Sequence, residues 1–133
     1  MRTLEQCEAK LEKYGMAESL FFPGIGNISW HFSTGDNIEV LYLEAQLGHG
    51  ATMYCRMVKT ILASGRLPYH SVFAYRLASN EMAAKFYAKL GWHQEDLGQS
   101  IYAGDRTVLM WITWKDLLLN LERFMHFDKD WSA

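Results

Sequence analysis

The stretch "NEMAAKFYAKLGW", residues 80–92, decides how we expect the second half of the chain to fold. Asn80 stands where a helix N-cap belongs, and Gly91 stands where a helix ends on a left-handed residue. Between them the apolar side chains recur at helical spacing on one side: Met82, Ala83, Phe86, Tyr87 and Leu90. The stretch therefore predicts a helix that leads into a strand. The pair Phe86-Tyr87 near its end is either a packing feature or part of a reactive site.

Patterns on both sides of this stretch predict the remaining elements. A capping-box pattern at Thr3 and Gln6 begins a helix over residues 3–15, and the other helices are expected at about 53–63 and 115–127. Alternating or branched residues predict strands at 18–22, 27–33, 38–46, 70–78, 92–98 and 107–114. The turn Gly35-Asp36-Asn37 should join two antiparallel strands. This order predicts an α+β (mixed α/β) domain on one central sheet.

Length and composition are those of one domain over residues 1–133. Half of the 133 residues are apolar and 14% are aromatic, which is enough to bury a single core. No run of 18 uncharged apolar residues occurs, so we expect no membrane span. The N-terminus has no apolar signal core, and we expect a cytoplasmic protein.

Charge and cysteine content argue against several classes of protein. The net charge is −2 with the basic residues spread out, so nucleic acid is not favoured as a partner, although a local basic patch stays open. The cysteines, Cys7 and Cys55, form no disulfide framework, and a bond between them is the minority interpretation. The histidines and cysteines lack metal-ligand spacing, so no metal site is expected.

The loop "LGHGAT", residues 47–52, lies between the strongest predicted strand and a helix. Gly48 and Gly50 allow close approach of the backbone to a ligand, and free N–H groups at the start of a helix form an anion site suited to phosphate or pyrophosphate. The loop is neither a dinucleotide fingerprint, because Met53 replaces the third glycine, nor a P-loop, because no Gly-Lys-Ser/Thr follows. His49 is either a phosphate contact or an ordinary exposed loop histidine.

The two regions together resemble one known family. Asn80, Ala83, Phe86, Tyr87 and the run Lys89-Leu90-Gly91-Trp92 resemble a helix and strand of the GCN5-related N-acetyltransferase (GNAT) superfamily. The glycine loop resembles the family's acetyl-CoA pyrophosphate loop and lies at the expected distance before that helix. The resemblance covers about residues 38–92, the larger part of the family's diagnostic half.

This resemblance implies a bent, V-shaped, mostly antiparallel sheet with acetyl-CoA as co-substrate between strands 38–46 and 71–79. The pantetheine arm would pair with the backbone near Tyr42, and Tyr87 would protonate the departing CoA thiolate. The implied pyrophosphate contacts are the amides of Gly48, His49, Gly50, Ala51 and Thr52. Asn80 is expected first as an N-cap and second as a cofactor contact.

Two departures from the family pattern concern the loop and the N-terminal part. The family begins its loop with Arg or Gln. Leu47 takes that place if Gly50 is the first glycine of the motif, and Ala45 takes it if Gly48 is. The N-terminal part, which normally shapes the acceptor site, is short.

The expected chemistry is acetyl transfer to a primary amine by direct attack. A free thiol has a pKa of about 8.5 and a tyrosine about 10, so proton transfer from Tyr87 to the thiolate is nearly balanced. Glu44 could accept the amine proton or be a solvated strand-end carboxylate, and its competitors are Glu39, His31 and His70. From spacing alone, Tyr87 would be a core aromatic.

Two other functions and one assembly remain as alternatives. The chain is alternatively a divergent member that modifies a nucleobase or another unusual amine, or a non-catalytic structural or interaction module, and Leu47 keeps both interpretations open. The last predicted helix has a wide apolar face with Trp111, Trp114 and Trp131 near it, which predicts a homodimer.

Overall fold

The order of helices and strands in the computed structural model is the order that the sequence predicts. The structure describes residues 3–12, 17–98 and 104–121. The elements are α1 (Leu4–Leu11), β1 (Glu18–Phe22), β2 (Gly26–Phe32), β3 (Ile38–Ala45), α2 (Gly50–Ser64), β4 (Ser71–Leu77), α3 (Glu81–Lys89), β5 (His93–Asp96), β6 (Thr107–Thr113) and α4 (Trp114–Leu121).

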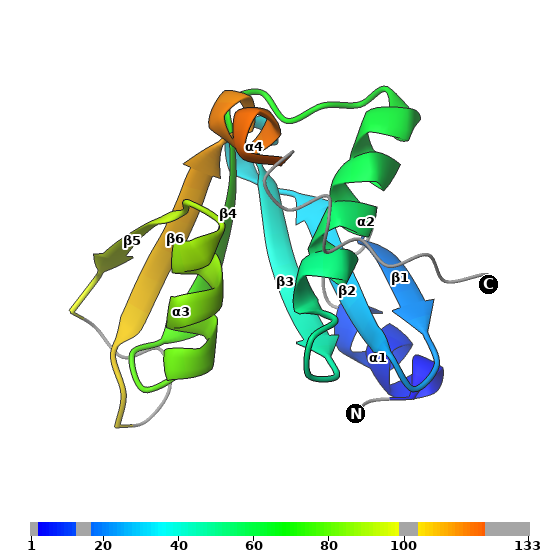
Figure 1. Ribbon diagram of the computed structural model, residues 1–133, viewed down its shortest axis with the longest axis horizontal. Helices are drawn as coiled ribbons and strands as arrows, with labels where there is room; N and C mark the ends of the chain where they lie inside the picture. Colours follow the sequence, from blue (N-terminus) through cyan, green and yellow to red (C-terminus); the bar gives the residue numbers. More distant parts are fainter. Residues whose placement is uncertain (1–2, 13–16, 99–103, 122–133) are drawn as a thin grey trace.

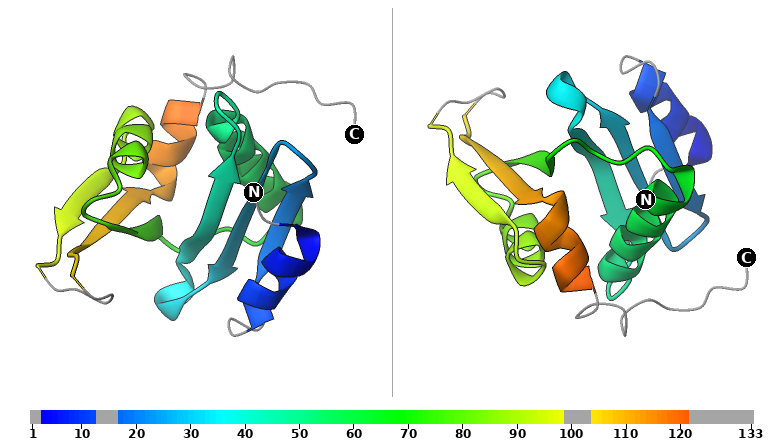
Figure 2. Two further views of the ribbon diagram at one scale, coloured as in Figure 1. Left: turned by 90° about the horizontal axis from the view of Figure 1, so that it is seen from below. Right: turned by 90° about the horizontal axis from the view of Figure 1, so that it is seen from above.

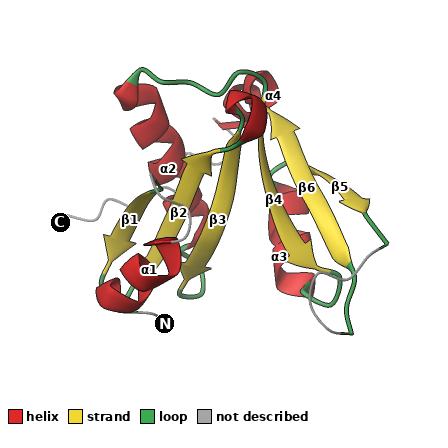
Figure 3. Cartoon of the chain, turned by 180° about the vertical axis from the view of Figure 1, so that it is seen from behind, coloured by secondary structure: helices red, strands yellow, loops and turns green. Residues whose placement is uncertain are grey.

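The six strands form one sheet that divides into two arms. The strand order is β1-β2-β3-β4-β6-β5, and every neighbouring pair is antiparallel except β3 and β4. These two parallel strands pair only at Ile38 with Val72 and at Glu39 with Phe73. Beyond that point they diverge, and the sheet has the shape of a V (Figures 1 and 3). The predicted bent, mostly antiparallel sheet is confirmed.

Hydrogen bonds to one asparagine side chain fix the point where the two arms meet. The side-chain Oδ1 of Asn37, directly before β3, accepts from the backbone N–H of His70 (3.1 Å) and of Ser71 (3.0 Å). The N–H of Tyr69 donates to the carbonyl of Asp36 (3.0 Å). The chain that returns from α2 is thereby attached to the β2–β3 turn, and β4 begins beside β3.

The helices cover the two faces of the sheet unequally. α2 and α3 lie on one face, whereas α1 lies on the opposite face of the arm formed by β1, β2 and β3 (Figure 2). α4 lies where the arms meet (Figure 1). The core fills the space between the sheet and α2, α3 and α4. Its most deeply buried side chains are Ile28, Trp30, Ile38, Met53, Met57, Val58, Val72, Leu90, Met110, Ile112 and Leu117.

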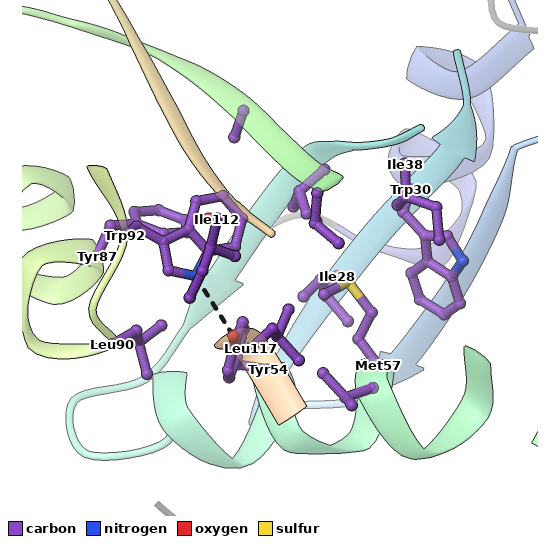
Figure 4. Packing of buried hydrophobic residues seen from close by; sticks show 14 of the residues in the cluster. Ile28, Trp30, Ile38, Tyr54, Met57, Tyr87, Leu90, Trp92, Ile112 and Leu117 are labelled. Atoms are coloured by element: carbon purple, nitrogen blue, oxygen red, sulfur yellow. Dashed lines mark hydrogen bonds between the residues drawn. The ribbon is translucent and has the colours of Figure 1, made fainter. Parts of the chain in front are cut away.

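An aromatic cluster joins α2 to α3 and so connects the two arms. Phe86 lies against Gly50, where an added Cβ would be 3.0 Å from the ring. The ring of Tyr87 packs on Trp92 at a centroid distance of 4.7 Å, and Trp92 in turn donates from Nε1 to the hydroxyl of Tyr54 on α2 (3.3 Å, Figure 4). The pair Phe86-Tyr87 therefore has a packing role whatever its chemistry.

Several predicted boundaries change or lie outside the described residues. The described part of α1 spans Leu4–Leu11, and residues 13–16, which include the predicted end at residue 15, lie outside the described part. α4 begins at Trp114, one residue before its predicted start, because the Thr113 hydroxyl accepts from the N–H of Asp116 (3.1 Å). Residues 122–127 of that predicted helix and Trp131 lie outside the described part.

Two further predictions can be compared with the described residues. Cys7 and Cys55 are buried and not bonded to each other, so the minority disulfide interpretation is wrong. Within the described residues no helix is long and apolar enough to cross a membrane. The apolar face of α4 is partly used by the core, because Leu117 is fully buried there. The homodimer stays a prediction.

Candidate active site

The loop after β3 leaves the N-terminus of α2 without a side-chain cap. Gly48 has a φ of +86°, and the N–H of His49 donates to the carbonyl of Gln46 (2.9 Å), which closes the turn. His49 is the N-cap residue, yet its side chain makes no capping hydrogen bond, and the first turn of α2 contains no acidic residue. The N–H groups of Gly50 and Ala51 point out of the helix, since no carbonyl precedes them by one turn.

The other described helices close their own N-termini. Thr3 and Gln6 form a complete capping box on α1. Asn80 accepts from the N–H of Ala83 (3.1 Å) at α3, and Thr113 does the same for α4. Among the four described helices, α2 alone therefore keeps a positive helix end for an external anion.

The edge of β3 that faces β4 loses its strand partner before it reaches this loop. Beyond Glu39 it makes no backbone pairs with β4 within the described residues. On its other side β3 pairs with β2, where Ser29 lies opposite Tyr42 and Trp30 opposite Val40, so Leu41 is an extra residue that makes a β-bulge. An exposed strand edge presents N–H and C=O groups that can pair with an extended partner.

Solved structures with the same architecture include several acetyltransferases. The chain is similar to a protein of the GNAT family from Desulfovibrio desulfuricans (13% identity, 84% of this chain and 82% of that one, TM-score 0.60). It is also similar to spermidine N-acetyltransferase from Vibrio cholerae in complex with CoA and spermine (14%, 89% and 79%, TM-score 0.64). A third is the Campylobacter jejuni N-acetyltransferase PseH in complex with acetyl coenzyme A (19%, 83% and 78%, TM-score 0.59).

The chain has the GNAT fold. No family model matches the sequence, and a search of curated proteins finds no match. The likeness is therefore one of architecture at 13–19% identity for these three structures. It confirms the fold that the sequence predicts, whereas the roles of single residues stay predictions.

The predicted cofactor residues of the loop after β3 differ in their burial and in what surrounds them. Gly48, His49 and Gly50 form the loop and the first helical position, and the amide of Ala51 follows. The Thr52 side chain is fully buried, so only its backbone could face a ligand. Leu47, which takes the place of the family's polar residue if Gly50 is the first glycine of the motif, is 96% exposed. The space next to Gly50 is filled by Phe86, so this glycine also serves helix packing.

Two buried tyrosines, one from each helix, lie in the aromatic cluster (Figure 4). Tyr87 is 6% exposed, burial raises its pKa, and its hydroxyl has no hydrogen-bond partner among the described residues. Burial likewise raises the pKa of Tyr54, whose hydroxyl accepts from Trp92. In the sequence Tyr54 shares an apolar stripe with Met57, Val58, Ile61 and Leu62, and nothing there assigns it a chemical role. A tyrosine in such a stripe is itself a signal, because a buried tyrosine hydroxyl needs a polar partner.

The candidate bases lie in three places. His31 and Glu39 face each other across β2 and β3, with 2.8 Å between Nε2 and Oε1, and both are less than one fifth exposed. Glu39 is the last residue of β3 that pairs with β4, so this pair lies where the arms divide. Glu44 lies near the other end of β3, beside the loop. His31 and Glu39 were predicted as separate candidates, although their equal spacing about the turn at Gly35 could have predicted this contact.

His70 lies apart from these groups. It lines a groove of about 600 Å³ together with Tyr69, Trp114 and Leu118, next to α4. The side chain is exposed, and its backbone carbonyl accepts from the N–H of Trp114 (2.8 Å). His70 therefore lies beside α4, whereas the other predicted bases lie on β2 and β3.

Proposed function

We propose that the chain is an acetyl-CoA-dependent N-acetyltransferase that acetylates a primary amine. The observation that carries this proposal is the uncapped N-terminus of α2, which directly follows the diverging strand β3. The first amides of α2 suit a pyrophosphate, and the edge of β3 where it diverges from β4 suits the amide groups of a pantetheine arm. The loop and the strand edge are continuous, so a single extended molecule could occupy both.

The reaction transfers one acetyl group and one proton. The neutral amine nitrogen attacks the thioester carbonyl carbon, a C–N bond forms, and the C–S bond breaks with its electron pair going to sulfur. A base on the protein accepts one proton from nitrogen, and an acid on the protein gives one proton to the thiolate. The products are an N-acetyl amine and free CoA, so neither a metal nor a redox step enters the balance.

Tyr87 is the acid in this proposal. Its hydroxyl keeps its proton free for donation, because no described residue accepts it. Burial raises the tyrosine pKa and so weakens the acid. The same burial would disfavour a thiolate beside it, and the two pKa values would rise together, so the transfer stays feasible.

The pair of His31 and Glu39 fits the role of base better than Glu44. From Glu39 to Ala45, the last residue of β3, the strand advances roughly 20 Å at about 3.3 Å per residue. A pyrophosphate at the loop would place the reactive end of an extended pantetheine arm well back along β3, toward the point where the arms divide. Glu44 adjoins the loop, so it lies beside the phosphate end of that path.

A non-catalytic interaction module is the second candidate, and the exposed Leu47 favours it. Calorimetric titration with acetyl-CoA separates the two. An enzyme should bind with a defined stoichiometry, and excess CoA should raise the free energy of unfolding by about 2.7 kcal/mol at one hundred times its Kd. Adenosine should stabilise less, because the loop recognises pyrophosphate. Absence of both heat and stabilisation at millimolar CoA would reject the enzyme.

A further inference from the structure

A groove of about 600 Å³ lies where the two arms of the sheet meet, and it is here called the apex groove. One wall is formed by residues 67–70 of the connection between α2 and β4. The other wall is formed by residues 113–115 and Leu118, at the end of β6 and the start of α4 (Figures 1 and 3). No residue of the glycine loop or of β3 lines the groove, and its volume suits a small molecule.

Backbone hydrogen bonds fix the two walls of the apex groove relative to each other and to the sheet. The N–H of Trp114 donates to the carbonyl of His70 (2.8 Å), which joins the walls directly. The N–H of His70 donates to the Asn37 side chain (3.1 Å), and the N–H of Tyr69 donates to the carbonyl of Asp36 (3.0 Å). The groove is therefore formed by the fold itself, and a pre-formed site lowers the entropic cost of binding.

The body of the apex groove is apolar and partly open to solvent. Pro68 and Leu118 contribute apolar surface, Leu67 is 46% exposed, and Tyr69 is 84% exposed. Apolar side chains that stay exposed together around a concave surface are typical of a binding site. A ligand of this groove should therefore have an apolar part.

The charged group of the apex groove is a cation. Lys115 is exposed and is the one charged side chain among the lining residues, all of which are described, and His70 adds an imidazole ring. No aspartate or glutamate lines the groove, since Asp116 follows Lys115 on α4 but is not a lining residue. This charge favours a ligand with a negative group.

A buried indole in the wall of the apex groove lacks a hydrogen-bond acceptor. Trp114 is 9% exposed, and its Nε1 is buried without a partner among the described residues. The indole of Trp92, in contrast, donates to the Tyr54 hydroxyl (3.3 Å). Buried donors without an acceptor are rare. The Trp114 N–H is thus a second observation, independent of the charge, that suits a ligand with acceptor oxygens.

We propose that the apex groove binds a small carboxylate with an apolar body. The carboxylate pairs with Lys115 and accepts from the indole N–H of Trp114, while the body lies along Leu67, Tyr69 and Leu118. The connection before β4 is attached to the β2–β3 turn and α4 follows β6, so the bound ligand bridges the two arms. The site is distinct from the acetyl-CoA site, and binding does not depend on acetyl transfer.

NMR of the indole N–H groups in the full chain tests this site. Trp114→Phe identifies the Trp114 resonance. The probe 4-phenylbutanoate should move that resonance in a saturable manner, whereas the Trp92 resonance should stay, because its N–H already has an acceptor. Acetate, which has the charge without the body, should cause no shift at the same concentration. The neutral 4-phenylbutanamide should bind about threefold to fivefold more weakly than the carboxylate.

Two lysine variants test the role of the charge. Lys115→Gln should lower the affinity for 4-phenylbutanoate to that for the amide, whereas Lys85→Gln, at an exposed lysine of α3, should keep the wild-type affinity. Absence of a saturable Trp114 shift, or equal affinity of wild type and Lys115→Gln, would overturn the proposal.

A competition experiment separates the apex groove from the proposed acetyl-CoA site. Excess CoA should leave the 4-phenylbutanoate shift of Trp114 in place. Displacement of the probe by CoA would also overturn the proposal, because the groove would then belong to the acetyl-CoA site. A protein that neither binds CoA nor acetylates amines, but shows the Lys115-dependent shift, would support the groove and reject only the proposed function.

Discussion

Helices α2 and α3 have the same place in their two arms but opposite N-terminal chemistry. Each follows one of the two diverging strands, and the two helices meet at Gly50 and Phe86. α3 satisfies its own first turn with the Asn80 side chain and places Glu81 at its positive end. α2 has neither feature. Of these two helices, therefore, only α2 keeps an N-terminus suited to an anion, because the Asn80 side chain caps α3 and no side chain caps α2.

The same two helices also differ in their buried tyrosines. Tyr54 of α2 accepts a hydrogen bond from Trp92, whereas the Tyr87 hydroxyl of α3 has no described partner. In the proposed reaction α2 thus holds the phosphates and α3 supplies the proton. Changes at single residues of either helix test this division of roles.

The largest effect is expected from Tyr87→Phe, which keeps the ring and removes the hydroxyl. If proton donation limits the chemical step, the rate of acetyl transfer should fall by roughly 10²–10⁴. The free energy of unfolding should change by less than about 1 kcal/mol, because the hydroxyl makes no described hydrogen bond. Steady-state kinetics and denaturant unfolding measure both quantities.

Tyr54→Phe is the matched control on α2. It should cost about 1 kcal/mol of stability, since the buried Trp92 Nε1 loses its acceptor, and it should leave the rate within a few-fold of wild type. A Tyr87→Phe enzyme with an undiminished rate would assign Tyr87 to packing alone. In that case Tyr87→Ala should still cost about 3–5 kcal/mol through the cavity that it leaves.

A smaller effect, with opposite signs in two measurements, is expected from His49→Asp at the start of α2. An acidic group at a helix N-terminus stabilises it by about 0.3–1 kcal/mol. The same charge should repel the pyrophosphate and weaken CoA binding by about tenfold or more in calorimetry. His49→Asn removes the imidazole without adding charge, so it should change CoA affinity much less. Equal CoA affinity of His49→Asp and His49→Asn would show that phosphate binds elsewhere.

The smallest effect is expected from Asn80→Ala at the corresponding position of α3. Loss of the cap to the N–H of Ala83 should lower the free energy of unfolding by about 1 kcal/mol, measured by urea denaturation. CoA affinity should stay at the wild-type value, because this helix end already has its own partner. A clear loss of CoA affinity would restore Asn80 as a cofactor contact and narrow the contrast between the helices.

Local patterns were sufficient to predict most of the elements and one of the two compared helix ends. Asn80 and Gly91 bracket α3 as expected, because capping and left-handed termination depend on residues within one turn. The glycine loop also falls where the sequence places it, before α2. The missing cap at α2 was harder to predict than the Asn80 cap at α3. Whether the His49 side chain accepts a hydrogen bond from the first turn of α2 depends on its rotamer, which local sequence does not fix.

The sequence by itself determined the order of the helices and strands and the position of Phe86 and Tyr87 near the end of α3. Only the tertiary structure decided which residues these side chains and the glycines contact. Gly26 lies just outside the predicted strand 27–33, yet it belongs to β2, where a Cβ would be 2.5 Å from the carbonyl oxygen of Glu44. Gly50 was predicted to allow a ligand to approach the backbone, and the structure shows that it also makes room for Phe86. The division of the sheet depends on Asn37 bonding residues 70 and 71. Spacing along the chain reports contacts within one turn or one hairpin, whereas these contacts join segments that are distant in sequence.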